Sequence, residues 1–439
     1  MTDPRLPDAD RSDRVEGVLL GAACGDALGV PYELDSAPLA LGEQPRMIGG
    51  GLGPYAPGEW SDDTQMAVVV ARVAAEQGLR TVPALDAVVE GWIGWLDVGA
   101  SDVGSQTRQV LSRVAAEGST RRWSSAASVS SALHRRTGRT AGNGSLMRTA
   151  PVALAFLDDP AMLTLAAGWL SEATHHDPLA GDACVLWCHA IRRAVLDGAM
   201  PDLAELVAEL PVARRDRWSG WIADAGRRPP SDFVPNGYVV TALQAAWSAI
   251  RHPAGEDPPL VASLNAAVHA GDDTDTVAAI AGSLLGAAHG ASAIPAEWLE
   301  VVHGWPGLRA DDLRALARRV AEKGAADAAA HCVPAELHEV AGHLVRRGLG
   351  EGHEFYVRGR PVPHGLSSEY VGLEQHDDGS YRVWYSGDRG TPRTYVQTTD
   401  WPVARERFVA EAISLARARN RRITIHDDPD ERRRGWRRG

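Results

Sequence analysis

The chain has 439 residues, of which 44% are hydrophobic and 23% charged, ordinary values for a globular protein with two or three domains. Asp and Glu (57) outnumber Lys and Arg (45), and the formal charge of −12 argues against a nucleic-acid surface over the whole molecule. The sequence has no apolar run of the ~18 residues that a membrane helix needs, and its polar start is not typical of a signal peptide. We therefore expect a cytoplasmic protein, with the oligomeric state left open.

The first predicted helix has an unusual glycine pattern. Residues 1–13 are expected to be a flexible leader, and the helix should start near Asp13. Glycine recurs at positions 17, 21, 25 and 29, so one helix face lacks side chains and lets another backbone or a ligand approach closely. Pro31 should end the helix, which places Glu33 in the loop that follows.

Residues 58–66 read GEWSDDTQM, with Ser61, Asp62 and Asp63 directly before an apolar helical run. Ser and Asp are favoured helix N-caps, and acidic residues suit a first helical turn, so a well-capped helix is one interpretation. A cap needs only one such side chain, whereas hard divalent cations bind clustered carboxylates and hydroxyls. For this segment alone, both interpretations stay open.

A second acidic motif follows some two hundred residues later. Residues 271–276 read GDDTDT and open a predicted helix over residues 277–289, again with glycines spaced by four. Three carboxylates within four residues repel one another unless a cation neutralises them. Two such motifs brought together would form an oxygen cage suited to Mg²⁺ or Mn²⁺. The repeat therefore favours a metal site over two separately capped helices.

Between the two motifs the chain is rich in alanine and predicted to be helical. Helices are predicted at residues 65–77, 82–95, 160–174, 180–197, 203–209 and 236–252. Residues 118–142 are rich in Ser and Arg and are predicted to be a connection with weak structure. The next segment, GNGSLMRTAP, has Asn143 between two glycines, a pattern typical either of a plain turn or of a loop that offers amide N–H groups to an anion.

The chain has no convincing βαβ alternation before residue 330, and helices at 295–302 and 310–330 complete a predicted all-α domain over residues 14–332. A small α+β domain is predicted at 335–427, followed by a basic, solvated tail at 428–439. Its predicted elements are helices at 336–347 and 403–419, strands at 353–357, 369–375, 381–386 and 393–398, a turn at 376–379 and a short segment at 422–426.

Six segments, taken together and in order, resemble the ADP-ribosylglycohydrolase family. They are GVLLGAACGDALGVPYE (17–33), GEWSDDTQM (58–66), SDVGSQT (101–107), GNGSLMRTAP (142–151), THHDP (174–178) and GDDTDTVAAIAG (271–282). Each segment is weak alone, but the six span about residues 14–330. The C-terminal domain lies outside the resemblance.

The resemblance implies an all-α orthogonal helical bundle with two Mg²⁺ ions, Mn²⁺ being an alternative, in a cleft that binds ADP-ribose. By motif position, the implied metal ligands are Ser61, Asp62, Asp63, Asp273, Asp275 and Thr276. The implied catalytic residues are Glu33, Asp62 and Asp273, with Glu33 as the candidate acid or base. The implied ADP-ribose contacts are Asp102, Asn143, Gly144, Ser145 and His175.

Two positions depart from the family pattern. Ser61 stands where Thr is more frequent and keeps the hydroxyl, whereas Asp272 stands where Gly is usual and adds a carboxylate beside the metal loop. We expect Asp272 either to alter the metal preference or to narrow the pocket.

The resemblance implies hydrolysis of the glycosidic bond between ADP-ribose and a modified protein side chain, with arginine as the preferred acceptor. Cleavage at the ribose C1 passes through an oxocarbenium-like state, for which a metal pair can orient water. Three alternatives stay open. The first alternative is a non-catalytic ADP-ribose-binding regulatory or immunity protein. The second is a hydrolase of a small ADP-ribose conjugate, and the third is an enzyme for serine-linked ADP-ribose.

Overall fold

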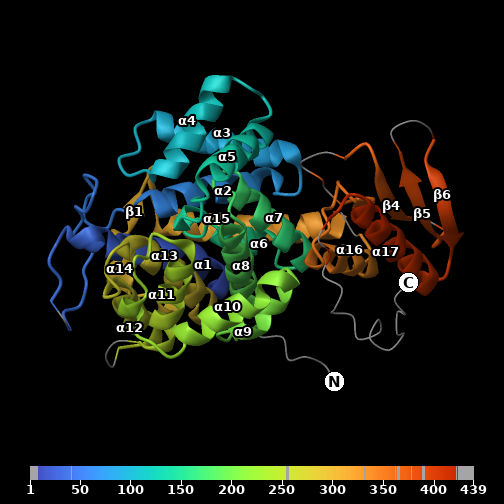
Figure 1. The fold of residues 1–439 in the computed structure, drawn as a ribbon. Helices are drawn as coiled ribbons and strands as arrows, with labels where there is room; N and C mark the ends of the chain where they lie inside the picture. The colour runs from blue at the N-terminus through green and yellow to red at the C-terminus, as the bar shows by residue number, and fades with distance from the viewer. Residues whose placement is uncertain are drawn as a thin grey trace. The chain divides into compact units, whose positions relative to one another are not determined.

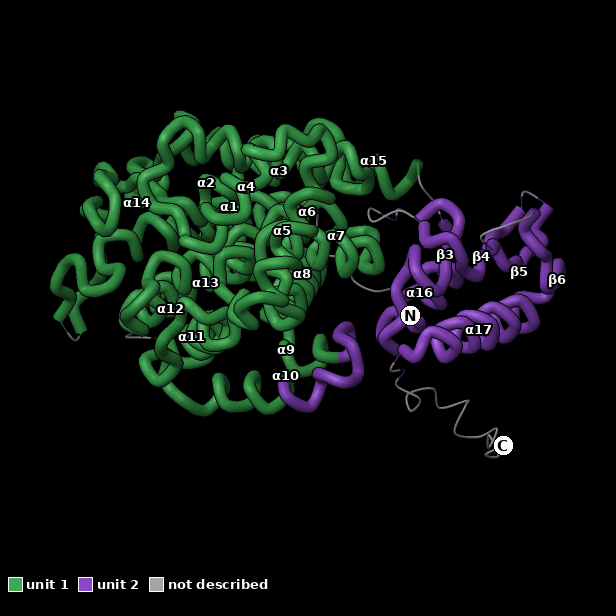
Figure 2. Tube along the Cα trace, turned by 45° about the horizontal axis from the view of Figure 1, so that its top comes forward, with its two compact units in different colours: residues 1–207, 218–330 green, residues 208–217, 331–439 purple. Residues whose placement is uncertain are grey.

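The computed structural model describes residues 8–40, 42–253, 257–330, 333–360, 362, 366–376, 378–387, 391–421 and 423. The chain divides into two units, one of residues 1–207 and 218–330 and the other of residues 208–217 and 331–439 (Figure 2). None of the described helices combines the length and apolarity that a membrane span requires.

The first unit is built almost entirely of helices, as the sequence predicts (Figure 1). Its α-helices are α1 (Asp8–Gly29), α2 (Asp62–Gln77), α3 (Val82–Asp97), α4 (Ser105–Glu117), α5 (Arg122–Thr137), α6 (Ala150–Ala155), α7 (Pro160–Glu172), α8 (Pro178–Asp197), α9 (Leu203–Leu206), α10 (Val212–Ala225, which starts in the second unit), α11 (Val239–Arg251), α12 (Pro259–Val268), α13 (Thr274–His289), α14 (Ala296–Val301) and α15 (Ala310–Ala330). Strands β1 (His303–Gly304) and β2 (Leu308–Arg309) form a short antiparallel pair.

Helices α1 and α13 pack backbone to backbone at the centre of this unit (Figure 1). A Cβ atom at Gly17 would fall 2.2 Å from the carbonyl oxygen of Gly286, and one at Gly21 would fall 2.1 Å from that of Gly282. Real Cβ atoms do not approach so closely, so only glycine permits this contact. The bare helix face that the sequence predicts is therefore a helix–helix contact rather than a ligand surface.

One predicted connection is a helix. Residues 118–142 contain α5, which buries Trp123, Ala126, Ala127, Ser130 and Leu133. Their spacing follows the 3.6-residue helical period, but the mean hydropathy is low because Ser and Arg occupy the other positions. Gly138, at φ 61°, ends the helix in the left-handed conformation.

The helix boundaries differ in smaller ways. α1 starts at Asp8, so residues 8–13 of the predicted leader are helical, while residues 1–7 lie outside the described residues. α11 starts at Val239 rather than at 236, and α10 and α12 have no counterpart in the prediction.

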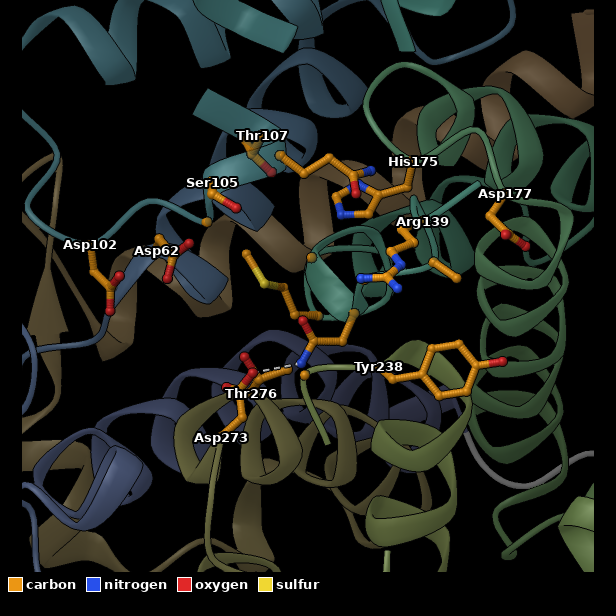
Figure 3. A pocket seen from close by; sticks show the side chains of 18 of the residues that line it. Asp62, Asp102, Ser105, Thr107, Arg139, His175, Asp177, Tyr238, Asp273 and Thr276 are labelled. Carbon is orange, nitrogen blue, oxygen red and sulfur yellow. Dashed lines mark hydrogen bonds between the residues drawn. The ribbon is translucent and has the colours of Figure 1, made fainter. Parts of the chain in front are cut away.

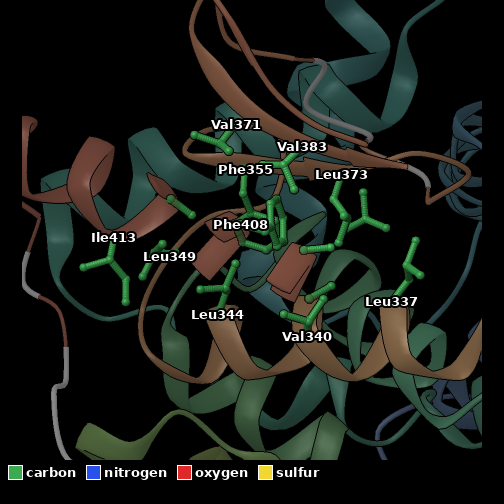
Figure 4. Packing of buried hydrophobic residues seen from close by; sticks show 14 of the residues in the cluster. Leu337, Val340, Leu344, Leu349, Phe355, Val371, Leu373, Val383, Phe408 and Ile413 are labelled. Carbon is green, nitrogen blue, oxygen red and sulfur yellow. The ribbon is translucent and has the colours of Figure 1, made fainter. Parts of the chain in front are cut away.

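The second unit is α+β. Its sheet has the order β3–β4–β5–β6, with strands Phe355–Val357, Tyr370–Gln375, Tyr381–Ser386 and Arg393–Thr398. β3 and β4 are parallel, and the other neighbours are antiparallel. Helices α16 (Ala335–Arg346) and α17 (Trp401–Ala418) bury their apolar residues with those of the strands, and the Phe355 and Phe408 rings meet edge to face (Figure 4).

The predicted strands are present, with β3 two residues shorter at its start. Gly379, at φ 80°, lies in the predicted turn between β4 and β5. Asp377, most of residues 422–426 and the basic tail at 428–439 lie outside the described residues.

Candidate metal centre and active site

Asp26 on α1 organises the first acidic motif from outside it. Its Oδ1 accepts hydrogen bonds from the amide and the hydroxyl of Ser61, both at 2.8 Å, and its Oδ2 accepts one from the amide of Thr64 at 3.0 Å. Asp26 therefore accepts the hydrogen bond from the Thr64 amide in the first turn of α2, a role that the capping interpretation gives to a residue of the motif itself. The side chains of Ser61 and Asp273 make no capping bond to their own helices in the described part of the chain.

The two acidic motifs come together as the resemblance implies. The carboxylates of Asp26, Asp63 and Asp275 have oxygens within 4.8 Å of one another, and so do those of Glu33, Asp273 and Asp275. Asp275 belongs to both triads. The Ser61 hydroxyl lies 3.0 Å from Asp63 Oδ2, while the buried Asp63 Oδ1 has no hydrogen-bond partner among the described residues.

Burial strongly disfavours the charged form of this cluster. Burial and then neighbouring carboxylates raise the pKa of Asp62, Asp63 and Asp275 well above the ordinary aspartate value. The same two causes raise the pKa of Glu33 to about 9, and burial alone raises that of Asp26 to about 6.

Clustered carboxylates with an unpartnered buried oxygen need a counter-ion if they are to be ionised together. All-oxygen donors suit hard divalent cations such as Mg²⁺ or Mn²⁺ better than Zn²⁺. The residues present therefore fit a metal centre, although they fix neither the ion nor the number of ions.

A pocket of about 600 Å³ opens beside the cluster. Figure 3 shows Asp62, Asp102 and Asp273 toward one end and His175, Asp177 and Tyr238 toward the other. Glu33, Asn143, Gly144, Asp275 and Thr276 also line it. Ser61, Asp63 and Asp26 are buried next to these residues but do not line the pocket.

The Asn143 loop connects the acidic cluster to the pocket. The Asn143 side-chain amide donates to Asp273 Oδ2 at 2.8 Å and to the backbone oxygen of Asn236 at 3.0 Å. Gly142 and Gly144 lie against the His175 ring, because a Cβ at either position would fall 3.1–3.3 Å from it. A side chain at either glycine would therefore push the His175 ring back by a few tenths of an ångström.

His175 is held as a neutral imidazole. Burial, and then the Arg148 guanidinium, lower its pKa to about 3. Arg148 donates to Thr174 Oγ1 at 2.6 Å, and this oxygen lies 2.7 Å from His175 Nδ1. Arginine can only donate, so the Thr174 hydroxyl hydrogen is available to Nδ1, and this arrangement favours the tautomer with the ring proton on Nε2, beside Gly142 and Gly144.

Ser145 has a different position from the other predicted contacts. Its side chain is buried, its hydroxyl lies 3.0 Å from that of Ser171, and it is not among the described residues that line the pocket. Its backbone completes the short 3₁₀ turn Asn143–Ser145.

Sequence reasoning missed Asp26, Asn236 and Arg148. Asp26 lies in the glycine-rich helix of the first motif, where a lone acid on a tightly packed helix was the available signal. Asn236 gives no such signal, because its role depends on a contact 36 residues along the chain.

The family model for ADP-ribosylglycohydrolases matches residues 7–330. The chain belongs to the ADP-ribosylglycohydrolase family. Members of this family are hydrolases, and the acidic cluster lies wholly within the matched region.

Two relatives of known activity support this membership. ADP-ribosylarginine hydrolase Tri1 of Pseudomonas putida is 33% identical over 66% of this chain and 74% of its own length. ADP-ribosyl-[dinitrogen reductase] glycohydrolase of Rhodospirillum rubrum is 30% identical over 65% of this chain and 89% of its own length. A solved ADP-ribosylglycohydrolase-related protein complex is similar with a TM-score of 0.58 and 28% identity, covering 72% of this chain and 99% of the other.

Proposed function

We propose that this ADP-ribosylglycohydrolase uses Mg²⁺ to release ADP-ribose from modified arginine side chains of proteins. The observation that carries the proposal is the pair of carboxylate triads that share Asp275, placed against a pocket of about 600 Å³. A pocket of this size is within the range of small-molecule and cofactor sites.

The metal ligands would be Ser61, Asp62, Asp63, Asp273, Asp275 and Thr276, as the resemblance implies, with Asp26 holding Ser61 in place. Bound divalent cations would supply Lewis acidity and lower the pKa of water. Manganese offers the same octahedral oxygen chemistry and is the natural substitute.

Proton transfer falls to the Glu33 and Asp102 pair. Asp102 is hydrogen-bonded to Glu33, and both side chains line the pocket. Glycoside hydrolysis generally uses two carboxyl groups, one to protonate the leaving group and one to take a proton from water. Burial raises the pKa of both carboxyl groups, but the hydrogen bond from Glu33 opposes the rise at Asp102, so Glu33 is the better proton donor of the two when the reaction starts.

ADP-ribose would extend from the carboxylates past the Asn143 loop to His175. A neutral His175 with a proton on Nε2 donates a hydrogen bond and adds no charge. Arginine as the acceptor is supported by the acidic end of the pocket, where the Asp102 carboxylate offers oxygens that match a guanidinium. The Pseudomonas putida relative, an ADP-ribosylarginine hydrolase by name, points to the same acceptor.

The test compares arginine-linked and serine-linked ADP-ribosyl peptides, with Mg²⁺, Mn²⁺ or EDTA present, and measures released ADP-ribose. We expect release from the arginine peptide, loss of release in EDTA, and loss in Asp62→Ala and Asp273→Ala. Faster release from the serine peptide would change the acceptor. Calorimetric binding of ADP-ribose without turnover on either peptide would instead identify a binding protein.

A further inference from the structure

Asn236 holds the second acidic motif through both its backbone and its side chain. Its Nδ2 donates to the Gly271 oxygen at 2.9 Å, its Oδ1 accepts from the Asp273 amide at 2.8 Å, and its own amide donates to Asp272 Oδ2 at 2.8 Å. Asn236 is fully buried just before α11. Three hydrogen bonds thus clamp the three residues from Gly271 to Asp273.

Asp272 adopts an unfavourable backbone conformation in this arrangement. Its φ is 64°, in the left-handed region that disfavours residues other than glycine but is tolerated best by Asn and Asp. Its carboxylate turns toward Asn236, and Asp272 is not among the described residues that line the pocket. The extra carboxylate therefore lies outside both carboxylate triads and outside the pocket lining, so the expected narrowing of the pocket is not observed.

The hydrogen bonds of Asn236 and Asp272 also extend to the pocket and to the segment that carries Glu33. The backbone oxygen of Asn236 accepts a hydrogen bond from the side-chain amide of Asn143, and the same amide also donates to Asp273 Oδ2. The backbone oxygen of Asp272 accepts a hydrogen bond at 2.8 Å from the amide of Leu34, the residue that follows Glu33. One small set of contacts therefore fixes Asp273, Asn143 and the segment that carries Glu33.

We infer that Asn236 and Asp272 are positioning residues, which hold the Asp273 carboxylate and the Asn143 amide in the arrangement that binds the metal and ADP-ribose. Outer residues of this kind typically change metal affinity by ~10–100-fold when they are replaced. The inference rests on the metal centre proposed above, and its test is designed to separate the two.

The first experiment uses the full-length chain, freed of metal with EDTA and dialysed, and measures Mn²⁺ binding by calorimetry. Asn236→Ala should bind Mn²⁺ about 10–100-fold more weakly than the wild type. Asn265→Ala is the matched control, because Asn265 is a buried asparagine on α12. It should keep wild-type Mn²⁺ affinity, whatever its melting temperature in EDTA.

The outcomes distinguish the two proposals. If the wild type binds Mn²⁺ and Asn236→Ala binds it equally well, with only its melting temperature lowered, Asn236 is structural and the inference is overturned. If the wild type binds neither Mn²⁺ nor Mg²⁺, the metal centre itself is wrong.

A second series tests Asp272 with changes that are less disruptive. Asp272→Asn keeps an acceptor for the Asn236 amide and tolerates positive φ, so its Mn²⁺ affinity should stay within about threefold of the wild type. Asp272→Gly removes the acceptor for the Asn236 amide but relieves the backbone strain at positive φ. Asp272→Ala removes the acceptor and keeps the strain. We expect the affinity order Asn, then Gly, then Ala, and equal affinities in all three would overturn the role of Asp272.

Discussion

Gly29 on α1 lies directly against Asp275 on α13: a Cβ at Gly29 would fall 2.4 Å from the Asp275 Cα. The same stripe of glycines brings Asp26, near the end of α1, and Glu33, four residues beyond that end, within reach of the carboxylate that both triads share. The glycine pattern and the acidic motifs therefore act together, because the close packing of α1 and α13 sets the spacing of the carboxylates.

Gly29→Ala should therefore damage both folding and metal binding. The added methyl must push α1 away from α13, and overpacking of this kind costs about 1–3 kcal/mol. Thermal unfolding and Mn²⁺ calorimetry measure the two effects. Gly168→Ala in α7 is the control, because a Cβ there meets open space. It should raise stability by about 1 kcal/mol and leave Mn²⁺ binding intact. A Gly29→Ala protein with wild-type stability would contradict the packing argument.

Asp275→Asn should separate metal binding from stability. The change removes the carboxylate shared by both triads, so Mg²⁺ should no longer raise the melting temperature. In EDTA the variant should melt above the wild type, because one buried and mutually repelled acid is gone.

Asp182→Asn is the matched control for that experiment. Asp182 is equally buried but accepts its hydrogen bond from Trp218 on α10. This variant should keep the Mg²⁺-induced rise in melting temperature. A Mg²⁺ response that survives in Asp275→Asn would show that the cation binds elsewhere.

The sequence was sufficient for the main architecture and for bringing the two acidic motifs together. Helical periodicity and the absence of βαβ alternation predicted the α class, and the repeat of the acidic motif predicted that Asp63 of the first motif and Asp275 of the second meet. It failed for α5, because a helix whose buried face is Trp, Ala and Ser has low overall hydropathy. It also failed for Asp26 and Asn236, because their partners are far along the chain and only the packed fold brings them together.

The interpretation of Ser61 shows the same limit. Ser is a favoured N-cap, and the residue does occupy the N-cap position of α2. Its hydroxyl nevertheless bonds Asp26, because an acid on α1 already serves the amide of Thr64. Local propensity favoured Ser61 as a cap, although the helix was predicted from residue 65 and begins at Asp62, and it could not predict that Asp26 would accept the bond from the Thr64 amide.

Removal of metal should make stability depend on pH with a definite sign. In the folded protein without metal, Asp26 and Glu33 have pKa values of about 6 and about 9, above their ordinary values of 3.8 and 4.5. The folded state therefore binds more protons than the unfolded state, and stability falls as pH rises. In EDTA, the melting temperature should decline from about pH 4 to about pH 9.

Mg²⁺ should flatten this decline, because the cation favours the ionised carboxylates and binds only the folded state. Differential scanning calorimetry at each pH, with and without Mg²⁺, makes the comparison. A metal-free protein whose stability rises with pH over this window would show that the carboxylates are not held in a repelling cluster.

The Arg148–Thr174–His175 contacts lead to a spectroscopic prediction. The neutral ring should carry its proton on Nε2 and show no titration between pH 8 and pH 5, because its pKa is about 3. Long-range ¹⁵N NMR of the imidazole reports both properties. Thr174→Val removes the hydroxyl between Arg148 and His175 and should weaken ADP-ribose binding about 5–10-fold, the effect of about one lost hydrogen bond.

The chain offers a matched pair for this experiment. Thr164 Oγ1 lies 2.8 Å from His189 Nε2, and burial, followed by neighbouring arginines, lowers the pKa of His189 to about 3 as well. His189 is not among the described residues that line the pocket, so Thr164→Val should change the His189 signals and leave ADP-ribose affinity unchanged. If His175 titrates near pH 6.5, or carries its proton on Nδ1, then the Thr174 hydroxyl does not fix its tautomer, and the hydrogen-bond donor proposed for ADP-ribose is absent.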